Sequence, residues 1–172
     1  MTPVRRLLIG ALVLTCAGAG FVAGRSLLRP ESAIVQPIAF NHEKHTQELE
    51  IVCRECHQYY ETGEHSGLPT LTTCRSCHEE PLTGSPEEQK IQTLSASGQD
   101  DVFRKLFRLP DHVYYSHRRH ARVAGIACEA CHGGIALTTR PPTVPQVRIT
   151  MDFCLDCHRK TGASSDCTGC HR

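Results

Sequence analysis

Five short segments of the chain repeat the pattern C-x-x-C-H, in which two cysteines three positions apart are followed directly by a histidine. This pattern is the attachment signature of c-type haem. Two thiols one helical turn apart can form thioethers with the two vinyl groups on one edge of a porphyrin, and the adjacent imidazole then lies beneath the iron. With 11 Cys and 11 His in 172 residues, a random order would give only about 0.04 such segments. They lie at residues 53–57, 74–78, 128–132, 154–158 and 167–171.

The motifs predict five covalently bound haem c groups. Other uses of cysteine explain the pattern less well. Zinc ribbons use C-x-x-C pairs two at a time, a disulfide framework leaves the five histidines unexplained, and thioredoxin-like pairs occur singly in a βαβ context. The thioether residues would be Cys53, Cys56, Cys74, Cys77, Cys128, Cys131, Cys154, Cys157, Cys167 and Cys170. The proximal iron ligands would be His57, His78, His132, His158 and His171.

A second axial ligand for each iron must come from elsewhere in the chain. Apart from the initiator, Met151 is the only methionine, so at most one haem can have His/Met ligation. The expected haems are therefore mostly bis-histidine and of low potential. Since enough histidines are present, no iron needs an open position, which argues against an enzyme. We interpret Met151 as a packing residue. The candidate distal ligands are His42, His45, His65, His112, His117 and His120.

The two H-x-x-H pairs are the best distal candidates. In a helix, histidines three positions apart lie on one face and can serve two different haems. His42 and His117 each precede the next motif by 11 residues, so we expect them to ligate the haem of that motif. We expect His45 and His120 to reach another haem and so to tie the modules together.

The other two histidines have weaker signals. His65 lies between the first and second motifs and is the remaining simple choice of ligand. His112 is nearest to being surplus, and its alternative role is a hydrogen bond to a haem propionate. The sequence leaves the pairing of distal histidines with haems open.

An internal repeat organises the chain. Residues 40–57 match residues 115–132 at an offset of 75, because six Cys or His positions coincide and an aromatic residue precedes each first histidine by two. We infer that one small module was used twice. The expected parts are a signal anchor or transmembrane helix at 1–29, a tether at 30–39, a first module with two haems at 40–80, a linker at 81–110 and a second module with three haems at 111–172.

The linker carries signals for a short helix. Ser85 is a favourable N-cap, a proline follows it, and Glu88 occupies the third helical position. A helix is expected from about 86 to 95, with Ile91 and Leu94 facing inward. Residues 101–109 are expected to add one or two turns, whereas the prolines within 138–148 predict an irregular loop.

The N-terminus contains an uncharged apolar run of 17 residues at positions 7–23, preceded by Arg5 and Arg6. At about 1.5 Å per residue the run spans roughly 25 Å, the short end of a transmembrane helix. Residues 17–19 offer a small-residue cleavage pattern, so a removed signal peptide is an alternative. The apolar run continues past that pattern, which favours a retained anchor, and Cys16 is interpreted as a small apolar residue within it.

Composition limits the size of the hydrophobic core. Of the 148 residues after position 24, only 43 are hydrophobic residues other than cysteine. This is thin for a core that supports itself, so we expect the cofactors to supply the missing apolar bulk. The formal net charge of +1 argues against a nucleic-acid binder that relies on a basic surface.

The segment F-N-H-x-x-H at residues 40–45, followed by the motif at 53–57, resembles the class III multihaem cytochromes. The resemblance covers most of residues 40–171 and implies a haem stack with little regular structure. The expected fold is therefore small, mainly α with much irregular structure, and carries one N-terminal transmembrane helix. The chain departs from the tetrahaem pattern at Gln58, where that group has a histidine.

A closer likeness extends to the membrane-anchored multihaem subunit of alternative complex III and of related menaquinone reductase complexes. It rests on the anchor, the five motifs, and segments 67–69, 110–117 and 151–154. The likeness implies an electron-transfer subunit of a quinone oxidoreductase complex. Its partners would be the other subunits of that membrane complex and a periplasmic redox protein, with no nucleic acid.

Haem c is assembled outside the cytoplasmic membrane. We therefore expect the chain at the bacterial cytoplasmic (inner) membrane, with its haem domain on the periplasmic side. Two alternatives stay open at this point. The first is a free-standing anchored cytochrome that passes electrons from quinol to a periplasmic reductase, and the second is a haem enzyme that reduces a small oxyanion.

Overall fold

The structure is a computed structural model, and it describes residues 15–16, 18, 20 and 33–171. The chain divides into two compact units, Met1–Ala33 and Ile34–Arg172. Most of the expected membrane helix and residues 30–32 of the expected tether lie outside the described residues. Among the described residues, no helix has the length and apolar character needed to cross a membrane.

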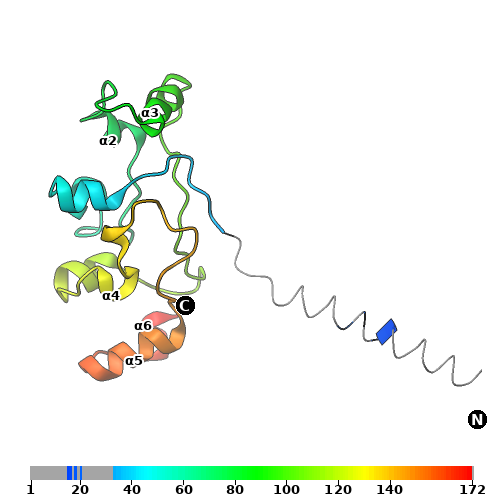
Figure 1. The fold of residues 1–172 in the computed structure, drawn as a ribbon. Helices are drawn as coiled ribbons and strands as arrows, with labels where there is room; N and C mark the ends of the chain where they lie inside the picture. The colour runs from blue at the N-terminus through cyan, green and yellow to red at the C-terminus, as the bar shows by residue number, and fades with distance from the viewer. Residues whose placement is uncertain (1–14, 17, 19, 21–32, 172) are drawn as a thin grey trace, which may run out of the picture. The chain divides into compact units, whose positions relative to one another are not determined.

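Short helices joined by irregular segments make up the described part of the second unit (Figure 1). Two of them, η1 and η3, are π-helical, and η2 and η4 are 3₁₀ turns. The extended pairing among these described residues is an isolated antiparallel bridge between Val113 and His171. In chain order the helices are η1 Lys44–Glu48, η2 Cys53–Glu55, α2 Leu71–Arg75, α3 Pro86–Ala96, η3 Arg118–Val123, α4 Glu129–His132, η4 Ile135–Leu137, α5 Met151–Thr161 and α6 Cys167–Cys170.

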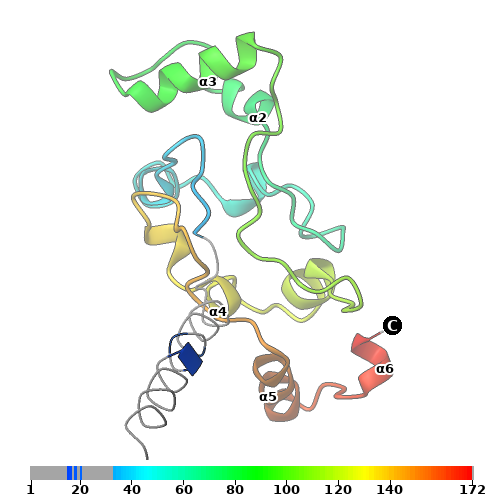
Figure 2. The ribbon, with the colours of Figure 1, turned by 90° about the vertical axis from the view of Figure 1, so that its right-hand side faces the viewer.

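The helix expected in the linker is α3. The Ser85 hydroxyl accepts a hydrogen bond from the Glu87 amide at 3.3 Å, which satisfies one of the free N–H groups at the helix start. Ile91 is buried, and Leu94 packs against the same cluster. The helix packs beside α2 (Figure 2).

The hydrophobic core is small. Among the described residues, the buried hydrophobic side chains are Leu71, Ile38 and Ile91, with exposed fractions of 0%, 4% and 7%. Val102 and Phe103 are partly buried against them. This cluster supports the α2–α3 region but reaches little of the remaining chain, as the composition predicts.

The one or two turns expected over residues 101–109 do not form. Instead the Gln36 side chain accepts from the Arg104 amide at 2.9 Å and donates to the Arg104 carbonyl at 2.7 Å. These backbone groups are therefore satisfied without a helix. The extended path also places Val102 and Phe103 against the hydrophobic cluster.

The irregular loop expected over 138–148 is confirmed. This loop contacts the first residue of the second unit, because the Thr143 carbonyl accepts a hydrogen bond from the Ile34 amide at 2.8 Å. Nearby, η4 packs against η1, and the Thr46 hydroxyl donates to the Ala136 carbonyl at 2.8 Å.

Candidate functional site

Each C-x-x-C-H motif is wound into a helical turn. In the first motif the His57 amide donates to the Cys53 carbonyl at 2.8 Å, and the motifs that end at His78, His132 and His171 have the same bond at 2.9 Å. The remaining motif lies within α5. Residues at spacings of three and four share a helix face, so both thiols and the imidazole of a motif lie on one side. None of the eleven cysteines is in a disulfide.

Polar caps begin three of the helices that carry these motifs. Thr70 caps α2, Thr150 caps α5 and Asp166 caps α6, each accepting from a backbone amide of the first turn at 3.1–3.3 Å. A side-chain oxygen at this position satisfies an amide that has no partner within the helix. The caps therefore define where each turn starts and so where its cysteines point.

The internal repeat is also a structural repeat. In the first copy the ring centroid of Phe40 lies 4.8 Å from that of His42 and 4.4 Å from that of His45. In the second copy the corresponding distances from Tyr115 are 4.9 Å and 4.7 Å. Each H-x-x-H pair is helical, as expected: His45 lies in η1 and His120 in η3, and the helical residues His42 and His117 lie just before these elements. The aromatic residue thus supports both histidine rings of its copy.

Several of these histidines are held in one tautomer. A carbonyl can only accept a hydrogen bond, so a ring nitrogen that contacts one must carry the proton. The other ring nitrogen, Nε2, then keeps the lone pair that a metal needs. Such Nδ1 contacts join His45 to the Asn41 carbonyl at 2.8 Å, and His57, His117 and His120 to the carbonyls of Gly67, Glu64 and Ser116 at 2.9 Å. His158 contacts the Ser164 carbonyl in the same way.

His42 reaches the same state through a hydroxyl. The Thr138 hydroxyl donates to the Ile135 carbonyl at 2.8 Å and lies 3.2 Å from Nδ1 of His42, so its oxygen accepts from the ring. Burial lowers the pKa of His42 to about 4, with smaller contributions from the nearby His57 and His45. The ring is therefore neutral at pH 7, with Nε2 available.

Motif histidines lie opposite other histidines in pairs. Two imidazoles that bind one metal from opposite sides, each through a bond of about 2 Å, have ring centroids about 6 Å apart. The observed centroid separations are 6.2 Å for His45 and His78, 6.3 Å for His117 and His132, 6.1 Å for His120 and His158, and 5.5 Å for His112 and His171. These ring pairs, together with the motif cysteines, fit covalent haem with two axial histidines.

The two halves of the chain match known cytochrome families. Residues 25–103 match the class III cytochrome c family, and residues 113–172 match the family described as cytochrome c7 and related cytochrome c. The chain is a multihaem cytochrome c whose first half is similar to the class III family and whose second half is similar to cytochrome c7. This confirms the resemblance inferred from the motifs, and with it the role as an electron carrier that is not itself an enzyme.

The cytochrome also resembles a curated protein from Nitratidesulfovibrio vulgaris named menaquinone reductase, multiheme cytochrome c subunit. The two are 28% identical over an alignment 162 positions long, which covers 80% of this chain and 77% of the relative. The match therefore spans both cytochrome halves rather than one motif.

The histidine of the first motif, His57, is not among the four ring pairs described above. His57 contributes to the lowered pKa of His42, but it contributes in the same way to the lowered pKa values of His117 and His132, so this effect does not single out a partner. In the second copy, His117 lies near His132 of the local motif and His120 lies near His158 of another motif. In the first copy His45 lies near His78 of another motif, and the pairing of His42 with His57 stays an expectation from the spacing.

His112 and His65, the two histidines outside the repeat, have different surroundings, and their roles as ligands stay predictions. His112 faces His171, and the bridge from Val113 to His171 and a hydrogen bond from the Tyr114 amide to the Cys170 carbonyl at 2.8 Å hold the two segments together. His65 follows Glu64, whose carbonyl accepts hydrogen bonds from the amide and from Nδ1 of His117, each at 2.9 Å. Burial is the main cause of the lowered pKa of His117, and His65 makes a smaller contribution. No sequence signal links His112 to a motif so far along the chain.

Met151 begins α5 and is 63% exposed. Its side chain therefore packs against little of this chain. The interpretation that it lines a haem pocket stays a prediction.

Proposed function

We propose that this cytochrome holds five haem c groups, each with two axial histidines, and relays electrons within a membrane quinone oxidoreductase complex. When bound, each haem supplies a one-electron redox centre whose potential depends on its ligands and surroundings. The chain contributes the thioether cysteines, the imidazoles and the hydrogen bonds that orient them. The main support is the set of ring separations between motif histidines and other histidines.

Four of the proposed axial pairs follow from the ring separations, and the fifth, His57 with His42, follows from the internal repeat. Each pair joins one motif histidine to one other histidine, and His65 is left as the spare. The pairs are His57 with His42, His78 with His45, His132 with His117, His158 with His120, and His171 with His112. The His112 and His171 rings, at 5.5 Å, would have to separate by about half an ångström to admit a metal between them.

The wider assembly is proposed from the named relative, which is a menaquinone reductase subunit. By analogy we propose that this cytochrome exchanges electrons with other subunits of such a complex. The apolar run at 7–23 would anchor it in the bacterial cytoplasmic membrane, and the need to attach haem c would place residues 34–172 on the periplasmic side.

Haem counting tests the central part of this proposal. A pyridine haemochrome assay on the purified protein, combined with its intact mass, is expected to give five haems per chain. A value near two would overturn the reading of the motifs. Carbon monoxide is expected to bind little to the reduced protein, since two imidazoles occupy each iron. Binding of one equivalent per chain would contradict the five bis-histidine sites.

Detergent extraction tests the assembly. A complex subunit is expected to migrate with several other proteins on native electrophoresis after mild extraction. If the cytochrome migrates alone and yet is reduced by quinol in membranes, it would instead be a free-standing anchored carrier. Recovery in the soluble fraction without detergent would contradict the retained anchor.

A further inference from the structure

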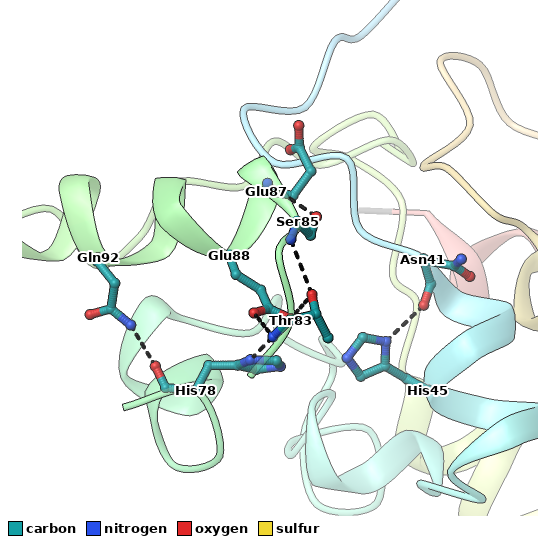
Figure 3. Close-up of polar contacts among 8 residues, drawn as sticks. All are labelled: Asn41, His45, His78, Thr83, Ser85, Glu87, Glu88 and Gln92. Atoms are coloured by element: carbon teal, nitrogen blue, oxygen red, sulfur yellow. Dashed lines mark hydrogen bonds and ion pairs between the residues drawn. The ribbon is translucent and has the colours of Figure 1, made fainter. Parts of the chain in front are cut away.

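The histidine of the second motif has a different neighbour from the carbonyl-bonded histidines described above. Its ring nitrogen Nδ1 lies 3.8 Å from the Oε1 atom of Glu88 (Figure 3). This distance is longer than a hydrogen bond, but Nδ1 is buried and has no hydrogen-bond partner within the described structure. The side chains of His78 and Glu88 are only 18% and 12% exposed. A carboxylate therefore takes the place that a backbone carbonyl has at His57 and His158.

The Glu88 carboxylate is fixed in this position. The Thr83 amide donates to Oε2 at 2.8 Å, and the Thr83 hydroxyl donates to Oε1 at 2.9 Å. The Ser85 amide in turn donates to the Thr83 hydroxyl at 3.2 Å. These hydrogen bonds favour the ionised carboxylate, and they lower the pKa of Glu88. The group is thus a held negative charge at the start of α3.

The same helix holds the motif itself. The Gln92 amide nitrogen donates to the His78 carbonyl at 2.7 Å (Figure 3). Gln92 and Glu88 are one turn apart on α3. Gln92 therefore binds the backbone of His78, while Glu88 lies near its ring. On the opposite ring of the pair, Nδ1 of His45 contacts only the neutral Asn41 carbonyl.

We propose that Glu88 is a positioning residue that makes the His78 site the hardest of the five to reduce. The inference rests on the proposed haem ligation. A carboxylate facing Nδ1–H increases the basicity of the ligating imidazole. A nearby fixed negative charge also favours the oxidised site, because reduction adds one electron and moves no proton. Both effects act in a poorly solvated place, where charge is screened weakly.

The test is a redox titration of the full chain loaded with five haems, followed by visible absorption. In Glu88→Gln the lowest of the five midpoints is expected to rise, with the one-electron reduction equilibrium changing at least tenfold, or about 59 mV. Glu88→Asp keeps the charge and is expected to keep that midpoint lowest. His45→Met identifies the site, because methionine ligation raises the potential of the same haem.

Glu87→Gln is the matched control. Glu87 precedes Glu88 in the same first turn, but its carboxylate pairs with Lys90 at 2.8 Å and accepts from the Ala39 amide at 2.7 Å. Its removal deletes the same charge from the same helix start without touching His78, as Figure 3 shows. It is expected to shift every midpoint by less than the tenfold change.

An unchanged lowest midpoint in fully loaded Glu88→Gln would overturn this proposal and leave the proposed function intact. Fewer than five haems in the wild-type chain would overturn the proposed function instead. If Glu88→Gln fails to load its haems, Thr83→Val carries the test, because it removes the hydroxyl that holds Oε1 near the ring. The same midpoint is then expected to rise by a smaller amount, and an unchanged value would again count against Glu88.

Discussion

In this cytochrome, the orientation of several histidine side chains is set by the backbone carbonyl that contacts Nδ1 of each ring. Backbone carbonyls face His45, His57, His117 and His120, which keeps the proton on Nδ1 and leaves Nε2 for iron. Such partners orient the ligating ring, and losing one typically costs about 10–100-fold in metal affinity or activity. The identity of each axial pair is therefore the most direct quantity to test at this scale.

The two histidines outside the H-x-x-H pairs give a paired experiment. His112→Ala is expected to leave one iron per chain five-coordinate, because His112 is the ring opposite His171. One high-spin iron should appear in the absorption and electron paramagnetic resonance spectra, and one carbon monoxide should bind after reduction. His65→Ala is expected to leave all five irons low-spin. The reverse result would restore His65 as the ligand.

Short helical elements position the cysteines and histidines of the motifs, and the residues that end a helix contribute to this as well as those that start it. His132 is the last residue of α4, and Gly133 follows it with φ 64° and ψ −151°. Only glycine adopts this region readily. A Cβ atom at Gly133 would also lie 2.7 Å from the Gln146 side-chain oxygen, so the loop over 138–148 packs directly onto the end of the helix.

This junction predicts a sharp difference between two adjacent glycines. Gly133→Ala is expected to reduce the free energy of unfolding of the haem-loaded protein by about 1–3 kcal/mol, the cost of a strained backbone conformation. Gly134→Ala is the control, since Gly134 has φ −78° and its Cβ would meet only an ordinary contact at 3.8 Å. It should change stability by less than about 1 kcal/mol. Equal effects in guanidinium unfolding curves would contradict the role of the backbone at Gly133.

At the scale of the whole molecule, the hydrophobic core found among the described residues is too small to hold the fold by side chains alone. The buried cluster of Ile38, Leu71 and Ile91 serves one region, while large apolar side chains such as Val35, Leu82 and Val123 are exposed. Ordering each residue costs about 1–2 kcal/mol of backbone entropy. Covalently bound porphyrins would supply the missing apolar contacts, as metals do in small metal-dependent domains.

Expression without the haem-attachment machinery tests this dependence. The apo chain is expected to be largely unfolded, with poor dispersion of its amide NMR signals and little helical circular dichroism. The same chain with haems attached serves as the control and is expected to unfold cooperatively. A well-dispersed spectrum from the apo chain would show that the protein part folds unaided.

The sequence by itself determined the features that depend on local spacing. A turn of helix places the groups of C-x-x-C-H on one side, so the motifs alone indicated covalent haem. The N-cap and turn signals around Ser85 were enough for α3, because helix starts depend on neighbouring residues. The offset of 75 between the copies was enough to indicate two equivalent modules.

Only the tertiary structure decided which distant side chains face each other. The spacing of His45 did not predict which motif histidine it would face, and the structure places it near His78. It likewise brings His112 to His171, sets Glu88 beside His78, and joins the Gln36 side chain to the backbone of Arg104. Helical turns form from neighbouring residues, whereas these contacts join different elements of the chain. Their partners follow from how the connecting loops pack, and that packing leaves no periodic signal in the sequence.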